Sequence, residues 1–438
     1  MTRKRIAILL IAVALSACAF AASAATIQVR YYLVGELTPV YREVPDGVQV
    51  PVAAVEALIA GPTPEEAAQG YESALPLSTK LVKATLEGET LSVDMSAEVL
   101  KGLDEARLFG ISKQFHSTVG DFPAITAVQL TCKGQLLSTY LPVSEPVGVS
   151  APTVIPKSVG LAGLGGRNIT IGPSHGRFWN GSGWYWQRTD PCGYGEAVLE
   201  DTNSIRLMQF LYQYLTQDGA TVHVPRELNE SHCCNPYEGL PYWKMAAYSW
   251  LRSNGLPCSV WASYTGNCGE ETATGRNSDD IRARPKFADY RGSEIYIAHH
   301  TNAGGGTGME TFRDTAMEYP AHETNSYNLA LSVHNNTMDA IHDMYDGSFA
   351  NRGVKDAAGG FGEIRIPNRP ACLVELAFHD KCDKDAIYLT DDFFRSVAMW
   401  GMYNGICAYF GTSPTWDKYS CEYVSDTIPS TMTEGQSY

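Results

Sequence analysis

The segment IYIAHHTNA at residues 295–303 decides the fold. Its first four residues have the apolar composition of a buried β-strand, and the polar side chains of His300 and Asn302 follow directly. Further strands are predicted at residues 168–171, 221–224 and 372–377. Helical patterns alternate with them, at residues 197–214, 323–344 and 383–410. This alternation predicts an α/β fold with a largely parallel sheet and helices on both faces.

Polar residues stand where the predicted strands end, and this edge presents the active site in an open α/β sheet. They are His175, Glu200 at the start of a helix, His300 and Glu375. Two histidines and one carboxylate suffice to hold a hydrolytic zinc ion with one position open for water. A further carboxylate beside that water can take its proton and later return it. Glu375 suits this role because an acid within an apolar run is costly to bury unless its shifted pKa is used.

Each of these residues also has a purely structural explanation. A histidine between glycine-rich turns is often a polar loop residue. Glu200 and Glu196 both suit the first turn of a helix, where the helix dipole favours acids. Neighbours along a strand point to opposite faces, so only one of His299 and His300 can point at a given site. The combination of the four residues therefore carries more weight than any one of them.

The organisation of the chain follows from its length and composition. A chain of 438 residues, of which 44% are hydrophobic and 18% charged, predicts two globular domains and argues against disorder. A stretch rich in Pro, Val, Ser and Gly at residues 142–166 indicates a linker. Strand and helix patterns at 26–141 predict a small α+β domain before it, and the α/β domain follows at 167–412. Residues 227–291 interrupt the second domain as a disulfide-rich insertion, and a tail remains at 413–438.

The first 24 residues predict export, because a basic start precedes an apolar run and small residues. Two processing routes fit this signal peptide. Ala22-Ser23-Ala24 offers a simple cleavage site that releases a soluble, secreted protein. Leu15-Ser16-Ala17-Cys18 resembles a bacterial lipobox, which would make Cys18 the lipid anchor of a cell-envelope lipoprotein. The apolar run is too short to span a membrane and no later stretch approaches the necessary length, so no integral span is expected.

Cysteines and charge bear on the compartment and the partners. Apart from Cys18, ten cysteines remain, and in an exported protein such a set predicts disulfides. A zinc–cysteine site is the alternative, but paired cysteines do not recur at finger-like spacing. The formal charge of −15 becomes −18 when the three basic residues at positions 3–5 are removed. This negative charge argues against nucleic-acid binding.

The α/β part resembles the zinc-dependent N-acetylmuramoyl-L-alanine amidases of the type 3 family. The likeness rests on five motifs in the family's order: Ser174-His175-Gly176, Glu200-Asp201, His300-Thr301-Asn302-Ala303, Arg352-Gly353-Val354-Lys355, and Val374-Glu375. The resemblance implies that His175, Glu200 and His300 bind Zn²⁺ and that Glu375 is the catalytic acid and base. It also favours Glu200 over Glu196 as the ligand.

Departures from the family pattern surround the first histidine. Gly172-Pro173-Ser174 replaces the usual Asp-Pro-Gly, so the orientation of His175 must come from elsewhere. Aromatic residues fill the gap between His175 and Glu200, where they could stack on a sugar or simply pack. Asn302, Arg352 and Lys355 are candidate substrate-binding residues, and for the two cations the alternative is a solvated helix end.

Residues 26–141 resemble the sporulation and spore-germination domain called GerMN, through Val29-Arg30-Tyr31-Tyr32-Leu33, Ser73-Ala74-Leu75-Pro76 and Leu91-Ser92-Val93-Asp94-Met95. This resemblance implies an interaction module without catalytic residues, which binds another component of the envelope. The only histidine in it, His116, is expected at the surface.

The sequence therefore predicts a peptidoglycan hydrolase that cleaves the amide between N-acetylmuramic acid and L-alanine with a zinc-activated water. Two alternatives stay open at this point. A zinc peptidase acting on other wall peptides could use the same ligands, and a non-catalytic wall-binding protein could keep the zinc site as structure.

Overall fold

A computed structural model gives the structure of the chain, and it describes residues 25–44, 47–143, 163–180, 182–234, 241–269 and 273–415. The predicted signal peptide with Cys18, most of the predicted linker and most of the predicted tail lie outside these residues. Within the described ranges, no helix combines the length and the apolar character that a membrane crossing requires.

A mixed sheet forms the centre of the α/β part. Its strands run in the order β11, β8, β12, β15, β13 and β14, with β11, β8, β12 and β15 parallel to one another. The next strand, β13, is antiparallel to β15, and β14 is parallel to β13. The prediction of a largely parallel sheet is therefore confirmed. The strand bounds are β8 Asn168–Pro173, β11 Thr221–His223, β12 Ile295–Asn302, β13 Met309–Arg313, β14 Asn351–Asp356 and β15 Ala371–Phe378.

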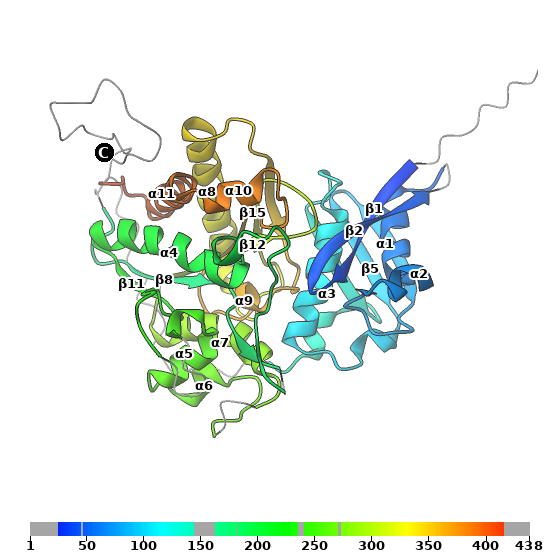
Figure 1. Cartoon of the computed structure of the whole chain (residues 1–438), viewed down its shortest axis with the longest axis horizontal. Helices are drawn as coiled ribbons and strands as arrows, with labels where there is room; N and C mark the ends of the chain where they lie inside the picture. Colours follow the sequence, from blue (N-terminus) through cyan, green and yellow to red (C-terminus); the bar gives the residue numbers. More distant parts are fainter. Residues whose placement is uncertain are drawn as a thin grey trace, which may run out of the picture.

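Helices cover both faces of this sheet, as predicted (Figure 1). One face carries α4 Glu200–Gln217, α8 Glu323–Met344 and α11 Asp392–Phe410, with α10 Asp385–Thr390 beside them. The other face carries α7 Arg276–Tyr290 and α9 Gly362–Arg365, and α5 Ala247–Ser253 and α6 Cys258–Trp261 pack on α7. Short 3-10 helices lie at Ala97–Leu100, Leu137–Tyr140, Gly195–Ala197, Tyr242–Lys244 and Pro320–His322.

Strand β12 shows how the sequence builds the two faces. Ile295 and Ile297 belong to the core under α4, α8 and α11, whereas Tyr296 and Ala298 belong to the core on the opposite face. This alternation continues to the end of the strand and places His299 and His300 on opposite faces. His300 therefore lies on the face of α7 and α9, where the candidate site is built.

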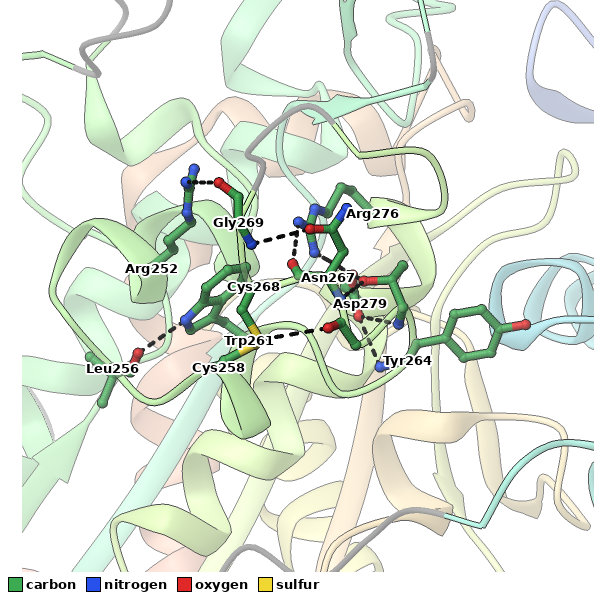
Figure 2. Close-up of a disulfide and its surroundings, with 12 residues drawn as sticks. Arg252, Leu256, Cys258, Trp261, Tyr264, Asn267, Cys268, Gly269, Arg276 and Asp279 are labelled. Carbon is green, nitrogen blue, oxygen red and sulfur yellow. Dashed lines mark hydrogen bonds and ion pairs between the residues drawn. A yellow bond between two sulfur atoms is a disulfide. The ribbon is translucent and has the colours of Figure 1, made fainter.

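Helix α7 is a feature that the sequence did not predict, because its residues fell within the expected insertion. Its charged side chains are buried, among them Arg276, Arg282 and Arg284, each 1% exposed or less. A helix with buried charges has no apolar stripe to reveal it. The structure supplies the missing partners: Arg276 Nη1 lies 2.7 Å from Asp279 Oδ2, beside the Cys258–Cys268 disulfide (Figure 2).

Disulfides are present as predicted, but the described cysteines do not all pair. Cys192 is bonded to Cys382, Cys258 to Cys268, and Cys233 to its neighbour Cys234. Three others, Cys132, Cys372 and Cys407, are free and buried. Cys372 belongs to the Glu375 strand, so none of the three described disulfides includes a residue of that strand. A buried cysteine in a strand packs as a small apolar residue.

The N-terminal part is an α+β unit with its own apolar core. That core is made entirely of residues between Ile27 and Leu141. Helix α2 begins at a capping box, in which Thr63 and Glu66 bond to each other's backbone N–H. The elements are β1 Ala25–Leu33, β2 Glu36–Val44, α1 Val50–Ala60, α2 Pro64–Ala68, β3 Tyr71–Glu72, β4 Leu81–Glu87, β5 Thr90–Met95, α3 Glu105–Val119, β6 Ala127–Cys132 and β7 Gln135–Leu136.

The two parts are docked side by side (Figure 1). Strand β6 extends the central sheet next to β14, through the single residue pair Ala127 and Asp356, and β5 and β4 follow. Helix α3 lies against the face of the sheet that carries α7 and α9. His116 on α3 is 4% exposed and packs on Phe312 and Phe361, so its expected surface position is wrong.

Candidate functional site

Three polar side chains from separate elements meet on the α7 face of the sheet. His175 follows β8, Glu200 opens α4, and His300 stands near the end of β12. One ligand atom from each lies within 4.8 Å of the others. Glu200 Oε1 is 3.5 Å from His175 Nε2 and 3.0 Å from His300 Nδ1. The fold thus brings together three of the residues that the sequence singled out.

The geometry of this cluster fits a zinc ion. Tetrahedral zinc bonds of about 2.0–2.2 Å to nitrogen and oxygen set neighbouring ligand atoms roughly 3–3.5 Å apart. In addition, His175 Nε2 is buried, and no hydrogen-bond partner reaches it from the described residues. An orphaned imidazole nitrogen is costly to bury unless something else binds it. Two nitrogens and one carboxylate oxygen are also the donor set of many hydrolytic zinc sites.

A carboxylate that the sequence did not single out supports His300. Glu363 on α9 accepts a hydrogen bond of 2.8 Å from His300 Nε2, leaving Nδ1 turned toward Glu200. Glu363 is held in turn by Arg284, at 3.0 Å, and by the Tyr296 hydroxyl, at 2.9 Å. Burial alone would lower the pKa of His300, but Glu363 and Glu200 raise it to about 9. The segment around Glu363 has no strand-end signal, so only the folded chain reveals its role.

An amide supports His175 in place of the missing carboxylate. Gln187 Oε1 lies 3.1 Å from His175 Nδ1, and Gln187 Nε2 donates to Asp280 over 3.2 Å. Asp201 fixes the adjoining loops, since it accepts hydrogen bonds from the backbone N–H of Gly176 and Arg188. Gln187 and Asp201 therefore orient His175 and its loop in place of the usual carboxylate.

The competing sequence candidates lie elsewhere. Glu196 pairs with Lys244 rather than joining the cluster. His299 is fully buried but points to the opposite face of the sheet from His300. Glu200, by contrast, is also bound by Arg188 at 3.1 Å. Burial would raise the pKa of Glu200, but His175, His300 and Arg188 hold it well below the usual range.

Glu375 stands beside His300 on the adjacent strand, because the two residues are register partners in the β12–β15 pair. Its carboxyl group is fully buried, and the burial raises its pKa, against the opposing effect of Lys113. Lys113 comes from α3 of the N-terminal part, and its Nζ lies 2.5 Å from Glu375 Oε1. The other oxygen, Oε2, has no hydrogen-bond partner among the described residues.

The three candidate substrate-binding residues converge on one further acid. Asn302, Arg352 and Lys355 all bond to the carboxylate of Glu310 on β13, which is 3% exposed. Arg352 and Lys355 lie on strand β14, so the alternative of a solvated helix end is wrong. Glu310 holds their charges together at the boundary with the N-terminal part, where Arg352 also donates to the Gly120 carbonyl.

The aromatic residues after His175 form a small hairpin of β9 Phe178–Trp179 and β10 Trp184–Tyr185. Trp184 stacks on Tyr248 with parallel rings. A cavity of about 390 Å³ separates this hairpin from α3. Its lining residues include His175, Tyr185, Trp186, Phe109 and Ile281. The packing interpretation therefore holds for Trp184, whereas Tyr185 and Trp186 line a cavity that also includes His175, and sugar stacking stays a prediction.

Comparison with known proteins gives two family matches. Residues 169–408, more than half of the chain, match the family described as N-acetylmuramoyl-L-alanine amidase. Residues 29–138 match the family described as Sporulation and spore germination. The chain is also 29% identical, over 143 residues, to the sporulation-specific N-acetylmuramoyl-L-alanine amidase of Bacillus subtilis. That match covers 32% of this chain and 51% of the relative, so the chain spans about half the length of that curated relative.

Solved structures give weaker likenesses. Ami1 of Mycobacterium abscessus is 16% identical and covers 56% of this chain and 99% of its own, with a TM-score of 0.37. The CwlD amidase of Clostridioides difficile, solved with the GerS lipoprotein, is 17% identical and covers 56% and 98%, with a TM-score of 0.35. The tandem GerMN domains of GerM from Bacillus subtilis are 20% identical and cover 26% and 42%, with a TM-score of 0.22.

Proposed function

The chain belongs to the N-acetylmuramoyl-L-alanine amidase family, and on that premise we propose that it hydrolyses the amide between N-acetylmuramic acid and the L-alanine of the peptidoglycan stem peptide. One observation carries the proposal: the cluster of His175, Glu200 and His300 lies beside Glu375, which is the register partner of His300 on the neighbouring strand. A metal-binding cluster with an adjacent buried carboxyl is the arrangement that metal-assisted amide hydrolysis requires.

Zinc is the cofactor in this proposal, held by His175 Nε2, Glu200 and His300 Nδ1. When bound there, zinc supplies a Lewis acid for the scissile carbonyl and lowers the pKa of water. The protein prepares the two histidines for this task. Glu363 accepts a hydrogen bond from His300 Nε2, and Gln187 Oε1 lies 3.1 Å from His175 Nδ1, so the other nitrogen of each ring faces the cluster.

Glu375 is the acid and base of the proposed reaction. Its carboxylate takes a proton from the attacking water and passes it to the departing L-alanine nitrogen. Burial suits this role, because a raised pKa brings a carboxyl closer to the pH at which it both accepts and donates. Asn302, Arg352 and Lys355 are proposed to contact the substrate, with the cations suited to a stem-peptide carboxylate.

The setting of the reaction is proposed to be the cell envelope, with peptidoglycan as the substrate. Export by residues 1–24 leads either to a soluble secreted protein or to a lipoprotein anchored at Cys18. The GerMN-like domain at 26–141, the linker at 142–166, the catalytic domain at 167–412 and the tail at 413–438 complete the proposed organisation. An envelope component is the proposed partner of the GerMN-like domain.

Mass spectrometry of peptidoglycan digested by the purified protein tests the activity. We expect release of free stem peptides with an L-alanine amino terminus, loss of that release in chelator, and its return with zinc. Glu375→Gln should lower the rate by about 10²–10⁴-fold. Glu196→Gln is the matched control and should retain the rate, since Glu196 pairs only with Lys244 among the described side chains.

The same digest separates the alternatives. A zinc peptidase would cut free peptides and leave the muramoyl amide intact. A wall-binding protein would bind peptidoglycan without releasing stem peptides at all. Release by Glu375→Gln at the rate of the unaltered protein would contradict the proposed role of Glu375.

A further inference from the structure

Helix α3 of the N-terminal part covers the catalytic side of the site. The ring of Phe109 lies 5.9 Å from the ring of His175 and 6.0 Å from that of His300. One turn further along the helix, the Lys113 ammonium contacts Glu375 at 2.5 Å and Asn302 at 3.2 Å. Both residues belong to the helix face that points into the catalytic part, so α3 contacts the proposed ligands and the proposed base at once.

The consequence for a substrate is steric. His175, Glu200, His300 and Glu375 are each 1% exposed or less in this arrangement. A glycan strand bearing a stem peptide has to bring its amide against these groups, and α3 fills the space that it would need. Lys113 also pairs with Glu375 Oε1 and so offsets the negative charge of the carboxylate that is the proposed base.

We propose that the N-terminal domain is a built-in inhibitor, with α3 as a plug in the space beside His175, His300 and Glu375 that the muramoyl peptide would need. The inference rests on the function proposed above. The domain must move away from these residues before peptidoglycan can reach them, so the docked structure is the resting form of the protein.

The composition of the contact explains how such a plug can be removed. Each part has its own large apolar core, and among the described residues Phe109, which is 4% exposed, is the one buried N-terminal residue in the core cluster that spans the boundary. Ion pairs provide much of the remaining contact between the two parts. They join Glu105 to Arg282 and Arg365, Glu36 to His379, and Lys113 to Glu375.

Buried ion pairs roughly break even, since the cost of desolvating the charges offsets their attraction. When the parts separate, these groups recover hydration, and neither domain core is broken. The sheet connection adds little resistance, because β6 and β14 meet at one residue pair. The docked and separated forms can therefore lie close in free energy, as a reversible inhibitor requires.

A wedge in α3 tests the inference without touching a catalytic residue. Ser112 is 1% exposed and faces Gly360, where an added Cβ would lie 2.3 Å from Ser112 Oγ. Ser112→Tyr cannot fit in the docked form, whereas on a separated domain its ring would face solvent. Leu77→Tyr, at a position 94% exposed in the same domain, is the matched control.

Small-angle scattering reports separation, and two further measurements report access. We expect Ser112→Tyr to expand and to release stem peptides from peptidoglycan at least tenfold faster than the unaltered protein, while Leu77→Tyr changes neither. With chelator present to prevent turnover, Ser112→Tyr should also bind N-acetylmuramoyl-L-alanyl-D-isoglutamine at least tenfold more tightly.

The binding measurement separates this inference from the proposed activity. Tighter binding by Ser112→Tyr without release of stem peptides would uphold the plug and refute the hydrolysis. An expanded Ser112→Tyr that binds and hydrolyses no better than the unaltered protein would refute the plug. Lys113→Glu is a second variant, which places a like charge against Glu375 and should also separate the parts. If Ser112→Tyr and Lys113→Glu both stayed compact, the proposed separation would be wrong.

Discussion

The two faces of the central sheet are built from different chemistry. Under α4, α8 and α11 the core consists mainly of aliphatic and aromatic side chains, with Ile297, Leu211 and Val374 fully buried. The opposite face carries α3, α7 and α9 (Figure 1). A network of buried charges lies there, which includes Glu105, Arg282, Arg284, Glu363 and Glu375.

This difference separates stability from function. Burial of apolar surface is non-directional and contributes roughly 25 cal/mol per Å², so the first face can hold the fold without fixing any one group exactly in place. Buried charges contribute little net stability, but each demands a partner in a defined position. The second face therefore positions the candidate metal ligands, and it forms a contact with the N-terminal domain that can separate.

Glu105→Ala should destabilise the contact between the two parts more than any other change proposed here. It leaves Arg282 and Arg365 buried without their shared carboxylate. Breaking such a buried pair costs about 3–5 kcal/mol. The loss should appear as separation of the two parts, measured by scattering and by hydrogen exchange of α3. The neighbouring Asp104→Ala removes only a helix N-cap and should cost about 1 kcal/mol. Equal effects of the two changes would contradict the view that buried charges of this face hold the two parts together.

Leu211→Ala tests the apolar face. The change leaves a cavity under α4 and should lower the free energy of unfolding by about 2–5 kcal/mol, measured by denaturant titration. Docking of α3 and zinc affinity should stay unchanged, since Leu211 contacts neither. If Leu211→Ala released the N-terminal part while the catalytic part stayed folded, the assignment of stability to this face would be wrong.

Glu363→Gln tests the positioning of a metal ligand. The neutral amide holds the His300 ring less firmly, and loss of such an outer carboxylate typically weakens metal affinity by about 10–100-fold. Competition with a chromophoric chelator measures the affinity for zinc. Glu196→Gln serves as the control and should bind zinc as the unaltered protein does. Unchanged affinity in Glu363→Gln would show that β12 alone fixes His300.

A change of pH should have the smallest effect on docking of the two parts, and it tests the charged face through His116. Burial, reinforced by Lys355, lowers the pKa of His116 to about 3 in the docked form. Once separated, His116 should titrate near its ordinary value of about 6.5. Below that pH His116 binds a proton in the separated form but not in the docked form. Docking therefore weakens as the pH falls from about 6.5 toward 3, by at most about 1.4 kcal/mol per pH unit.

Scattering between pH 7 and pH 5 measures this effect of His116. Its surroundings include both signs of charge and two rings, from Lys113, Lys355, Glu310, Phe312 and Phe361. Acid also protonates carboxylates such as Glu105, whose docked pKa lies below the ordinary range, and this acts in the same direction. His116→Phe isolates the histidine and should flatten the dependence. An unaltered profile in His116→Phe would assign the whole effect to the carboxylates.

Much of the catalytic part followed from local patterns. The apolar strand at residues 295–298, the long helix at 323–344 and the buried strand around Glu375 were all predictable, because burial on a sheet imposes simple periodicities. The meeting of His175, Glu200 and His300 followed from the rule that strand ends share one edge. Helix α7 was not predictable, since its buried arginines resemble solvated ones until their partners are known.

The sequence by itself determined four parallel strands of the sheet, the helices that cover its apolar face and the residues that can bind a metal, because each depends on short-range spacing. Only the tertiary structure decided what surrounds those residues. Glu363, Gln187 and Lys113 are distant in the chain from the ligands or base that they contact. The physical reason is that a charge is paired by whatever the fold brings within a few ångströms, and no periodicity in the chain records that distance.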